Sequence, residues 1–222
     1  MQRLELKATG AAIAVAAGVL FGTGAQAQSL SGIKVGEEVS SVPKLAARPL
    51  LSRGADAHEA RRWTLPDGNR LSVAANPETK RVVYAEKTWG GGAHGRPADF
   101  PGFVYGQTTL ADIRAHAQNN GFAFKEHLID MRPDGLALFN AYEVEGAPGL
   151  VVTFVTKLSR QDDERLRTGK VTVDINRAAR LDAIILADAE YLDTIWGDAK
   201  LRGKAYKPIR WEPPRQAALA SR

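Results

Sequence analysis

The amino-acid sequence predicts an α+β fold built from two tandem units, each a helix followed by an antiparallel meander, with a C-terminal hairpin and helix and a basic tail. Two recurring motifs support this prediction. A Gly-x-x-x-Gly step stands at residues 32–36 and again at 102–106, and a Pro-Asp-Gly turn follows each step, at residues 66–68 and 133–135. Motifs that recur in the same order and at nearly the same distance are typical of a duplicated unit.

The N-terminal residues have the pattern of a secretory signal peptide. Arg3 and Lys7 precede an alanine-rich apolar run, and Ala25 and Ala27 form the small-x-small motif that signal peptidase cleaves. A membrane anchor is the alternative, but the apolar run is shorter than the ~20 residues that a spanning helix needs. We therefore expect cleavage near Ala27, a periplasmic or secreted protein, and no transmembrane segment in the mature chain.

Composition narrows the classes of function. The chain has 30 basic and 25 acidic residues, and much of the positive excess lies in residues 200–222, where Glu212 is the single acid. A nucleic-acid-binding protein, which needs a basic face on its folded body, is therefore not expected. The absence of cysteine excludes disulfides, thiolate metal sites, cysteine catalysis and a lipid-modified cysteine.

Changes in composition divide the chain into six parts. The glycines at 90–92 indicate a flexible connection, because the Lys-Ser/Thr sequence of a phosphate-binding loop does not follow them. The expected parts are a signal peptide over 1–27, a first α+β unit over 28–89, a Gly-rich linker over 90–101, a second α+β unit over 102–158, C-terminal strands and a helix over 159–199, and a basic, proline-containing tail over 200–222.

In the first unit, the helix signal is weak because Pro43 interrupts it. The turn residues at 66–68 and at 76–79 separate segments of strand-forming residues. The strands expected in this unit cover 62–65, 70–75 and 81–89.

The second unit opens with the clearest helix signal of the chain. Thr109 can cap the first turn, and Asp112 adds negative charge where the helix dipole favours it. Apolar residues at helical spacing follow until the Asn-Asn-Gly sequence at 119–121, so we expect a helix over 109–118. The strands expected after this helix cover 122–131, 136–144 and 150–158.

The C-terminal part predicts a hairpin and a helix. The polar segment 159–170 is expected to be a loop or a single helical turn. Alternating apolar residues predict a strand over 171–175, and an apolar run predicts another over 181–186. Asp188 can cap a short helix that ends at Gly197. A continuous helix over 178–196 is the alternative.

No catalytic sequence motif is present, so any catalytic site would have to use dispersed residues. The four histidines lack the close spacing of a helical or hairpin metal site, and we expect neither a metal nor a cofactor. An enzyme, most simply a hydrolase, is an alternative function, with a site assembled from His116, His127 and Glu143. The same two histidines are the pair to test first for zinc binding.

A non-enzymatic binding role would use aromatic and basic residues. Tyr84 and Tyr142 lie on predicted strands and are expected on a sheet face that docks a partner, since aromatic residues are favoured at interface centres. The tail combines basic and aromatic residues with prolines that favour an extended chain. This composition is typical of a disordered segment without a specific role, and the functional hypothesis is that the tail binds an envelope protein or an anionic surface. Its candidate binding residues are Lys204, Tyr206, Lys207, Arg210 and Trp211.

The tandem pattern resembles the modules of the β-lactamase-inhibitor-protein-like and small outer-membrane lipoprotein group. The resemblance implies a tandem α+β fold over residues 32–158 and a protein that binds other proteins without catalysis. The chain lacks the lipidated cysteine of the lipoproteins and the disulfides of the inhibitor. The residues that carry the resemblance are Gly102, Gly106, Thr109, Asp112 and Ile113, with Gly32, Gly36 and Val42 in the other copy.

The sequence therefore predicts an exported, non-enzymatic binding protein of the cell envelope. The alternatives are the enzyme described above and a small-molecule binder with a pocket between the two units. A dry apolar cavity would favour the small-molecule binder, and a deep cleft with converging titratable groups would favour the enzyme.

Overall fold

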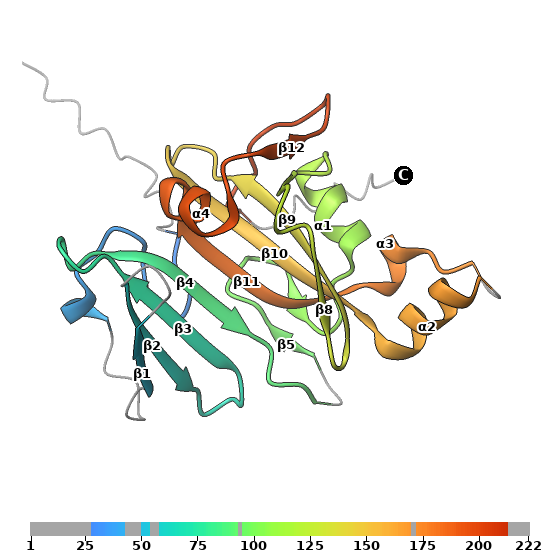
Figure 1. Cartoon of the computed structure of the whole chain (residues 1–222), viewed down its shortest axis with the longest axis horizontal. Helices are drawn as coiled ribbons and strands as arrows, with labels where there is room; N and C mark the ends of the chain where they lie inside the picture. The colour runs from blue at the N-terminus through green and yellow to red at the C-terminus, as the bar shows by residue number, and fades with distance from the viewer. Residues whose placement is uncertain (1–27, 43–49, 54–57, 93–94, 170–171, 213–222) are drawn as a thin grey trace, which may run out of the picture.

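Ten strands of the described part of the chain form one antiparallel sheet in the computed structural model (Figure 1). The structure describes residues 28–42, 50–53, 58–92, 95–169 and 172–212, so the expected signal peptide and residues 213–222 lie outside it. The strands follow one another across the sheet in the order β1-β2-β3-β4-β11-β10-β9-β7-β12, and β8 pairs with β9.

The longest strands lie at the centre of the sheet, and the helices are short. The strands of the large sheet are β1 (Leu50–Arg53), β2 (Glu59–Thr64), β3 (Arg70–Ala75), β4 (Val82–Thr88), β7 (Phe122–Phe124), β8 (Ile129–Arg132), β9 (Gly135–Glu143), β10 (Leu150–Ser159), β11 (Arg180–Asp188) and β12 (Lys200–Arg202). A separate pair consists of β5 (Arg96–Pro97) and β6 (Val104–Tyr105). The helices are η1 (Val39–Ser41), α1 (Leu110–Ala117), α2 (Arg160–Thr168), α3 (Ile175–Ala178) and α4 (Ala189–Trp196). None of the helices in the described residues is long and apolar enough to cross a membrane.

The expected α+β class with two helix-plus-meander units is wrong, because the protein is mostly β. Both predicted meanders belong to one sheet, since β11 pairs with β4 along one edge and with β10 along the other. The described residues before the first meander contain the short 3-10 helix η1 and no α-helix. The edge of β4 has N–H and C=O groups that β11 satisfies, and such long-range pairing leaves no mark in local spacing.

Most strands and turns lie where the sequence predicts them. β3 and β4 fall on the predicted segments 70–75 and 81–89, and β9, β10 and β11 fall on three further predicted strands. Gly68 and Gly135 end the two Pro-Asp-Gly turns with φ of 82° and 144°. A Cβ added at Gly135 would lie 2.0 Å from the carbonyl oxygen of Leu158, so only glycine fits this hairpin.

Three local predictions in the C-terminal half are wrong. The strand predicted over 171–175 is absent from its described residues, 172–175, because the Asp174 side chain accepts a hydrogen bond from Asn176 N and caps α3. By contrast, the strand predicted over 181–186 and the helix capped by Asp188 are confirmed as β11 and α4, which excludes the alternative of a continuous helix over 178–196. The segment 122–131 is two strands, β7 and β8, and the polar segment after residue 158 forms the nine-residue helix α2.

α1 begins as the sequence predicts. Thr109 Oγ1 accepts a hydrogen bond from Asp112 N at 3.0 Å, and Asp112 Oδ2 accepts one from Thr109 N at 2.8 Å. The two residues therefore form a reciprocal capping box. The helix ends at Ala117, since Gln118 takes the left-handed conformation with φ of 56°.

The recurring Gly-x-x-x-Gly step forms a similar turn in both places. Residues 30–33 and 100–103 each close a turn by a backbone hydrogen bond from the fourth residue to the first. Gly32 and Gly102 occupy the same place in these turns, and both have φ of 81°, which favours glycine. The apolar residues at the ends of both turns are buried in the same core cluster.

The second glycine of each step attaches its turn to a central strand. Gly36 N donates to the carbonyl oxygen of Val82 in β4 at 2.7 Å, and Gly106 N donates to that of Leu181 in β11 at 2.8 Å. Because β4 and β11 are antiparallel neighbours and both attachment points lie near the start of their strand, the two turns are attached at opposite ends of the same strand pair.

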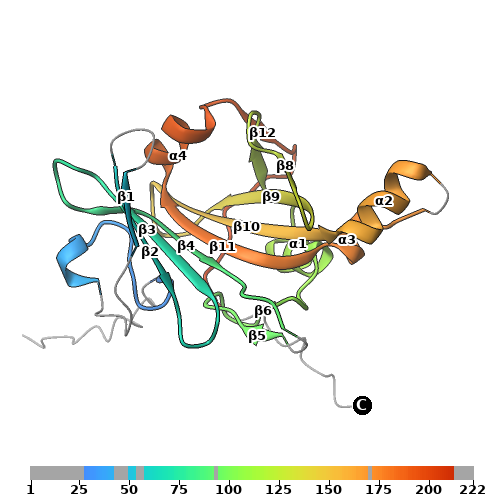
Figure 2. The ribbon, with the colours of Figure 1, turned by 60° about the horizontal axis from the view of Figure 1, so that its bottom comes forward.

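Both faces of the sheet are covered by other elements (Figure 2). α1, the segment 98–105 and the segment 30–42 pack on one face, here called the α1 face. α4 packs on the opposite face, the α4 face, where Leu192 and Trp196 belong to a cluster with buried residues of β7, β9, β10 and β11. The large apolar side chains exposed in the described residues are Leu, Ile and Met, with no aromatic residue among them. The sheet therefore offers no broad aromatic face.

The described part of the expected tail is an integral layer of the fold. Lys200 and Arg202 lie in β12, which pairs with β7. Ile209 N donates to Glu143 O at 2.9 Å, so the segment also runs alongside the end of β9. Trp211 is 7% exposed, and its ring centroid lies 5.0 Å from that of Phe100 on the α1 face. Residues 200–212 therefore run along the folded body, and Ile209 and Trp211 complete its core.

Replacing Trp211 tests this arrangement. Trp211→Ala is expected to lower the free energy of unfolding by about 3–5 kcal/mol, because it removes a buried aromatic ring from the core. Urea unfolding followed by circular dichroism measures the change. Lys204→Ala is the matched control, since Lys204 is an exposed residue of the same segment, and its effect should stay within about 0.5 kcal/mol. Equal effects of the two variants would contradict the buried position of Trp211.

Candidate functional site

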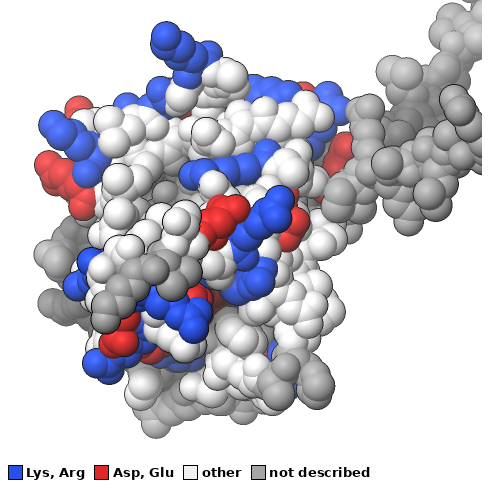
Figure 3. All heavy atoms as spheres, turned by 90° about the vertical axis from the view of Figure 1, so that its right-hand side faces the viewer, with Lys and Arg blue, Asp and Glu red and all other residues white. Residues whose placement is uncertain are grey.

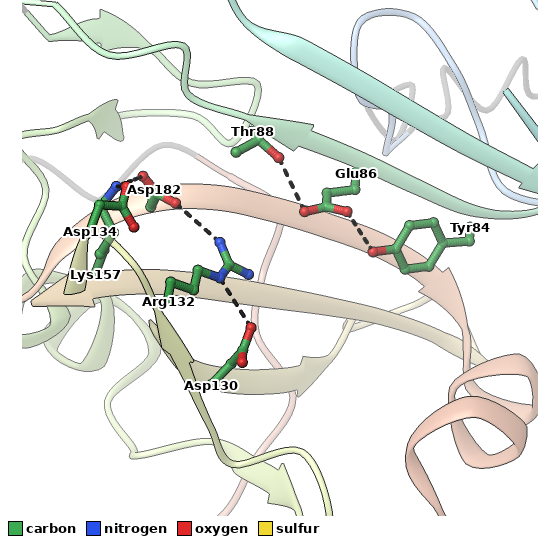
Figure 4. A network of polar contacts seen from close by, with 8 residues as sticks. All are labelled: Tyr84, Glu86, Thr88, Asp130, Arg132, Asp134, Lys157 and Asp182. Atoms are coloured by element: carbon green, nitrogen blue, oxygen red, sulfur yellow. Dashed lines mark hydrogen bonds and ion pairs between the residues drawn. The ribbon is translucent and has the colours of Figure 1, made fainter. Parts of the chain in front are cut away.

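Charged and hydroxyl side chains form two separate groups of contacts on the sheet (Figure 4). One group lies within β4, and the other, here called the network, lies around the β8–β9 hairpin, β10 and β11. Its centre is Asp182 of β11, whose carboxylate lies 3.3 Å from Lys157 Nζ and 3.6 Å from Arg132 Nη1. Lys157 also lies 2.8 Å from Asp134 Oδ2, and Arg132 Nε lies 3.2 Å from Asp130 Oδ2. The network therefore ties the β8–β9 hairpin to β10 and β11.

Burial determines how strongly these groups interact. The Asp182 side chain is 6% exposed, so its charge would be costly without the two cations beside it. Burial alone would lower the pKa of Lys157, but Asp134 and Asp182 together outweigh it and hold that pKa above its ordinary value. The hydrogen bond from Lys157 holds the pKa of Asp134 below its ordinary value. Lys157 and Asp134 thus stay ionised near neutral pH, which favours a structural ion pair over proton transfer.

Tyr84 and Tyr142, which we expected to face a partner, direct their hydroxyls into the protein. The Tyr84 hydroxyl donates to Glu86 Oε2 at 2.8 Å, and the Thr88 hydroxyl donates to Glu86 Oε1 at 3.1 Å. Tyr142 is fully buried, and its hydroxyl donates to Asn119 O at 3.3 Å. Burial raises the pKa of both phenols, so both stay protonated.

The sheet separates the two histidines that we expected as a catalytic or metal-binding pair. His116 of α1 contacts the rings of Phe100 and Phe103 in the cluster on the α1 face. His127 stacks on Trp196 in the cluster on the α4 face, with ring centroids 4.4 Å apart. The structure does not bring these histidines together. Nowhere in its described residues do three His, Asp or Glu side chains gather as metal ligands.

The carboxylates next to β9 are also paired. Glu143, the acid of the enzyme alternative, forms an ion pair with Arg202, and Glu145 forms one with Arg210. The hydrogen bond from Arg210 holds the pKa of Glu145 below its ordinary value, and Glu145 raises the pKa of Arg210 in turn. A carboxylate with a lowered pKa is a poor general acid at neutral pH.

The remaining tail residues lie along the edge of β9 and along a polar cleft. Tyr206 Oη accepts a hydrogen bond from Glu143 N at 2.9 Å, and burial raises the pKa of Tyr206 to about 12. Lys207 Nζ donates to Gln118 Oε1 at 2.6 Å. The cleft, of about 870 Å³, lies between α1 and residues 207–212, and its charged lining residues carry both signs.

Both signs of charge also alternate on the end of the molecule formed by α2 and α3 (Figure 3). On α2, three ion pairs link residues one turn apart: Arg160 with Glu164, Arg165 with Asp162, and Arg167 with Asp163. Interspersed charges of this kind give no single-sign surface for a polyanion.

An apolar pocket of about 430 Å³ lies between α1, α3 and the strands β7, β8, β9 and β12. Leu128, Ile129 and Leu201 line it and are 42%, 50% and 53% exposed. These are three of the seven exposed large apolar side chains in the described residues. The volume falls within the range of ~300–1,000 Å³ that is typical of small-molecule sites.

Arg114 is the charged residue of this pocket. Its guanidinium donates to the side-chain oxygens of Asn176 in α3 and of Asn140 in β9, the latter at 3.2 Å. Its Nε is buried and has no hydrogen-bond partner among the described atoms. The other lining residues are apolar side chains, glycines and amides, so none of the described lining residues neutralises the guanidinium.

Sequence reasoning missed this pocket because no local pattern marks it. Arg114 occupies the polar side of the predicted helix, where a solvated arginine is ordinary. Leu128 and Ile129 fall inside the segment predicted as one strand, and their exposure results from the break between β7 and β8. A prediction of the pocket would have required recognising that the chain leaves the sheet between β7 and β8.

The chain matches no family model, no curated protein and no solved structure. The resemblance to the β-lactamase-inhibitor-protein-like group therefore stays a prediction. A function must be argued from the pocket, the cleft and the network described above.

The two aspartates that contact Lys157 provide a matched test of the network. Asp182→Asn is expected to lower the free energy of unfolding by about 2 kcal/mol, because it leaves two partly exposed cations without their shared buried anion. Asp134→Asn should cost less than about 1 kcal/mol, since the Asp134 side chain is 65% exposed. Denaturant unfolding measures both, and a larger effect of Asp134→Asn would contradict the central role of Asp182.

His127 is expected to make the free energy of unfolding depend on pH. Burial lowers the pKa of His127, so the unfolded chain binds a proton more readily than the folded chain does. The stability linked to this residue is therefore present above the ordinary histidine pKa of about 6.5 and declines as the pH falls below it. Urea unfolding at about pH 7.5 and about pH 5.5 measures the loss, which should be smaller in His127→Gln. An unchanged loss in that variant would assign the pH dependence to other groups.

Proposed function

We propose that this chain is an exported, non-enzymatic binding protein of the cell envelope, and that the apolar pocket beside Arg114 is its ligand site. The observation that supports the proposal most strongly is an open cavity of about 430 Å³ lined by three exposed leucine and isoleucine side chains. Covering apolar surface contributes roughly 25 cal/mol per Å². Contiguous exposed apolar patches are therefore typical of sites that a ligand or partner covers.

A small-molecule ligand fits the structure better than a flat protein interface. Elements cover both faces of the sheet, and the hydroxyls of Tyr84 and Tyr142 point inward. Two of the basic residues expected to attract a partner already have partners within the protein: Arg210 forms an ion pair with Glu145, and Lys207 donates a hydrogen bond to Gln118. The pocket lies beside the second meander, not between the two units, because all its lining residues belong to 110–203.

A catalytic role has less support. Proton transfer needs a free acid or base near a substrate, often with its pKa moved towards neutrality. His116 and His127 lie in separate clusters, and Glu143 is paired with Arg202. Export is supported by the charged, apolar and small-x-small sequence of residues 1–27.

Titration with the neutral apolar fluorophore N-phenyl-1-naphthylamine tests the ligand site. We expect saturable binding to the wild-type protein, measured as an increase in fluorescence. Leu201→Asp should weaken it about tenfold or more, because it places a charge at the apolar rim.

Leu50→Asp is the matched control. Leu50 is 74% exposed and lies on β1, the edge strand at the opposite end of the sheet from β12. This variant should bind the fluorophore as the wild type does. No binding to the wild type, or equal binding by both variants, would overturn the proposed site.

A further inference from the structure

The charge beside the pocket narrows the class of ligand, and this step rests on the proposed function. We propose that the ligand is an apolar molecule with a single carboxylate group. Arg114 binds the carboxylate, and the hydrocarbon part lies against Leu128, Ile129 and Leu201. A free aliphatic acid has this chemistry.

The partners of Arg114 hold the guanidinium in place without cancelling its charge. Asn140 and Asn176 accept hydrogen bonds through amide oxygens, which are neutral. An arginine has five N–H donors in a planar fork, and these two bonds leave donors for a further acceptor. The amides come from β9 and α3, so two separate elements fix the orientation of the side chain. A planar fork held in this way suits the two oxygens of a carboxylate.

The surroundings increase the electrostatic preference for an anion. Charges interact more strongly next to apolar walls than in water, because the local dielectric constant is lower. Among the described lining residues, Arg114 meets no acidic side chain. The positive charge of Arg114 also acts on Tyr142. Burial raises the pKa of Tyr142, and the charge of Arg114 lowers it by a smaller amount. An anionic ligand would supply the missing counter-charge.

The polar cleft next to α1 does not select a ligand in the same way. Its lining contains Asp112, Glu145 and Glu212 together with Lys207 and Arg210. Glu145 and Arg210 already neutralise each other. The apolar pocket combines one sign of charge with a hydrophobic wall, and this combination matches an amphipathic anion.

Calorimetric titration of the full chain with decanoate and with decan-1-ol tests the inference, because the two probes differ in the charged group. The wild type is expected to bind decanoate about tenfold more tightly than decanol, since a hydrogen bond to a charged group is stronger than a neutral one. Arg114→Gln should bind the two probes equally. Arg177→Gln is the matched control: Arg177 lies on α3, is 84% exposed and should leave the preference intact.

Each result leads to a separate conclusion. If neither probe binds the wild type, the proposed function fails. If the wild type binds both equally, or if Arg114→Gln keeps the preference, the ligand site stands and the assignment of a carboxylate to Arg114 fails.

The salt dependence of binding gives a second test, which uses the wild-type protein alone and does not depend on whether a variant folds. Raising the NaCl concentration from about 0.05 M to about 0.5 M should weaken decanoate binding and leave decanol binding nearly unchanged, because salt screens the charge interaction. Equal effects of salt on both probes would also overturn the assignment.

Discussion

The backbone pairing of β4 with β11 is the interaction on which the rest of the structure depends. It joins residues about 100 positions apart in the chain, such as Tyr84 and Ala187, and makes one sheet from two meanders. Without it each meander would end in an edge of unpaired N–H and C=O groups. Because the sheet continues across this pair of strands, α1 and both glycine turns share one buried cluster, while α4 covers the other face.

The same arrangement of strands explains why the apolar pocket lies at the β12 end of the sheet. The long strands β10 and β11 lie at the centre, buried on both faces. Towards β12 the strands are short, and β7 and β8 share the edge of β9. Short strands leave gaps that side chains from α1 and α3 cover incompletely, and the apolar pocket occupies this region. Arg114 lies there because α1 places it between β9 and α3.

The sequence predicts local structure well where one or two residues decide it. The capping box of Thr109 and Asp112 determines the start of α1, and the Pro-Asp-Gly turns determine two hairpins. The fold class was mispredicted because strand order depends on pairing between distant segments. The strand predicted over 171–175 failed for a local reason, since Asp174 caps a helix there.

The candidate site was harder to predict than the fold. Tyr84, Tyr142 and Trp211 have the residue types of a binding surface, yet aromatic side chains are used as often for packing, and here they pack. Arg114 has no motif around it. Its role as a candidate binding residue follows from its surroundings. Two amide side chains hold the guanidinium, apolar side chains lie beside it, and none of the described lining residues is acidic. Such a combination exists only after α1, α3 and four strands have come together.

The position of Ile209 and Trp211 has a consequence for the order of folding. Both side chains are buried in the cluster on the α1 face, although they follow every strand of the large sheet in the chain. A chain that emerges with its N-terminus first, from a ribosome or through a membrane, exposes Phe100 and its neighbours until these late residues arrive. The core on the α1 face therefore closes only after residues 209–211 have joined it, and a chain that stops before residue 209 leaves apolar surface open to aggregation.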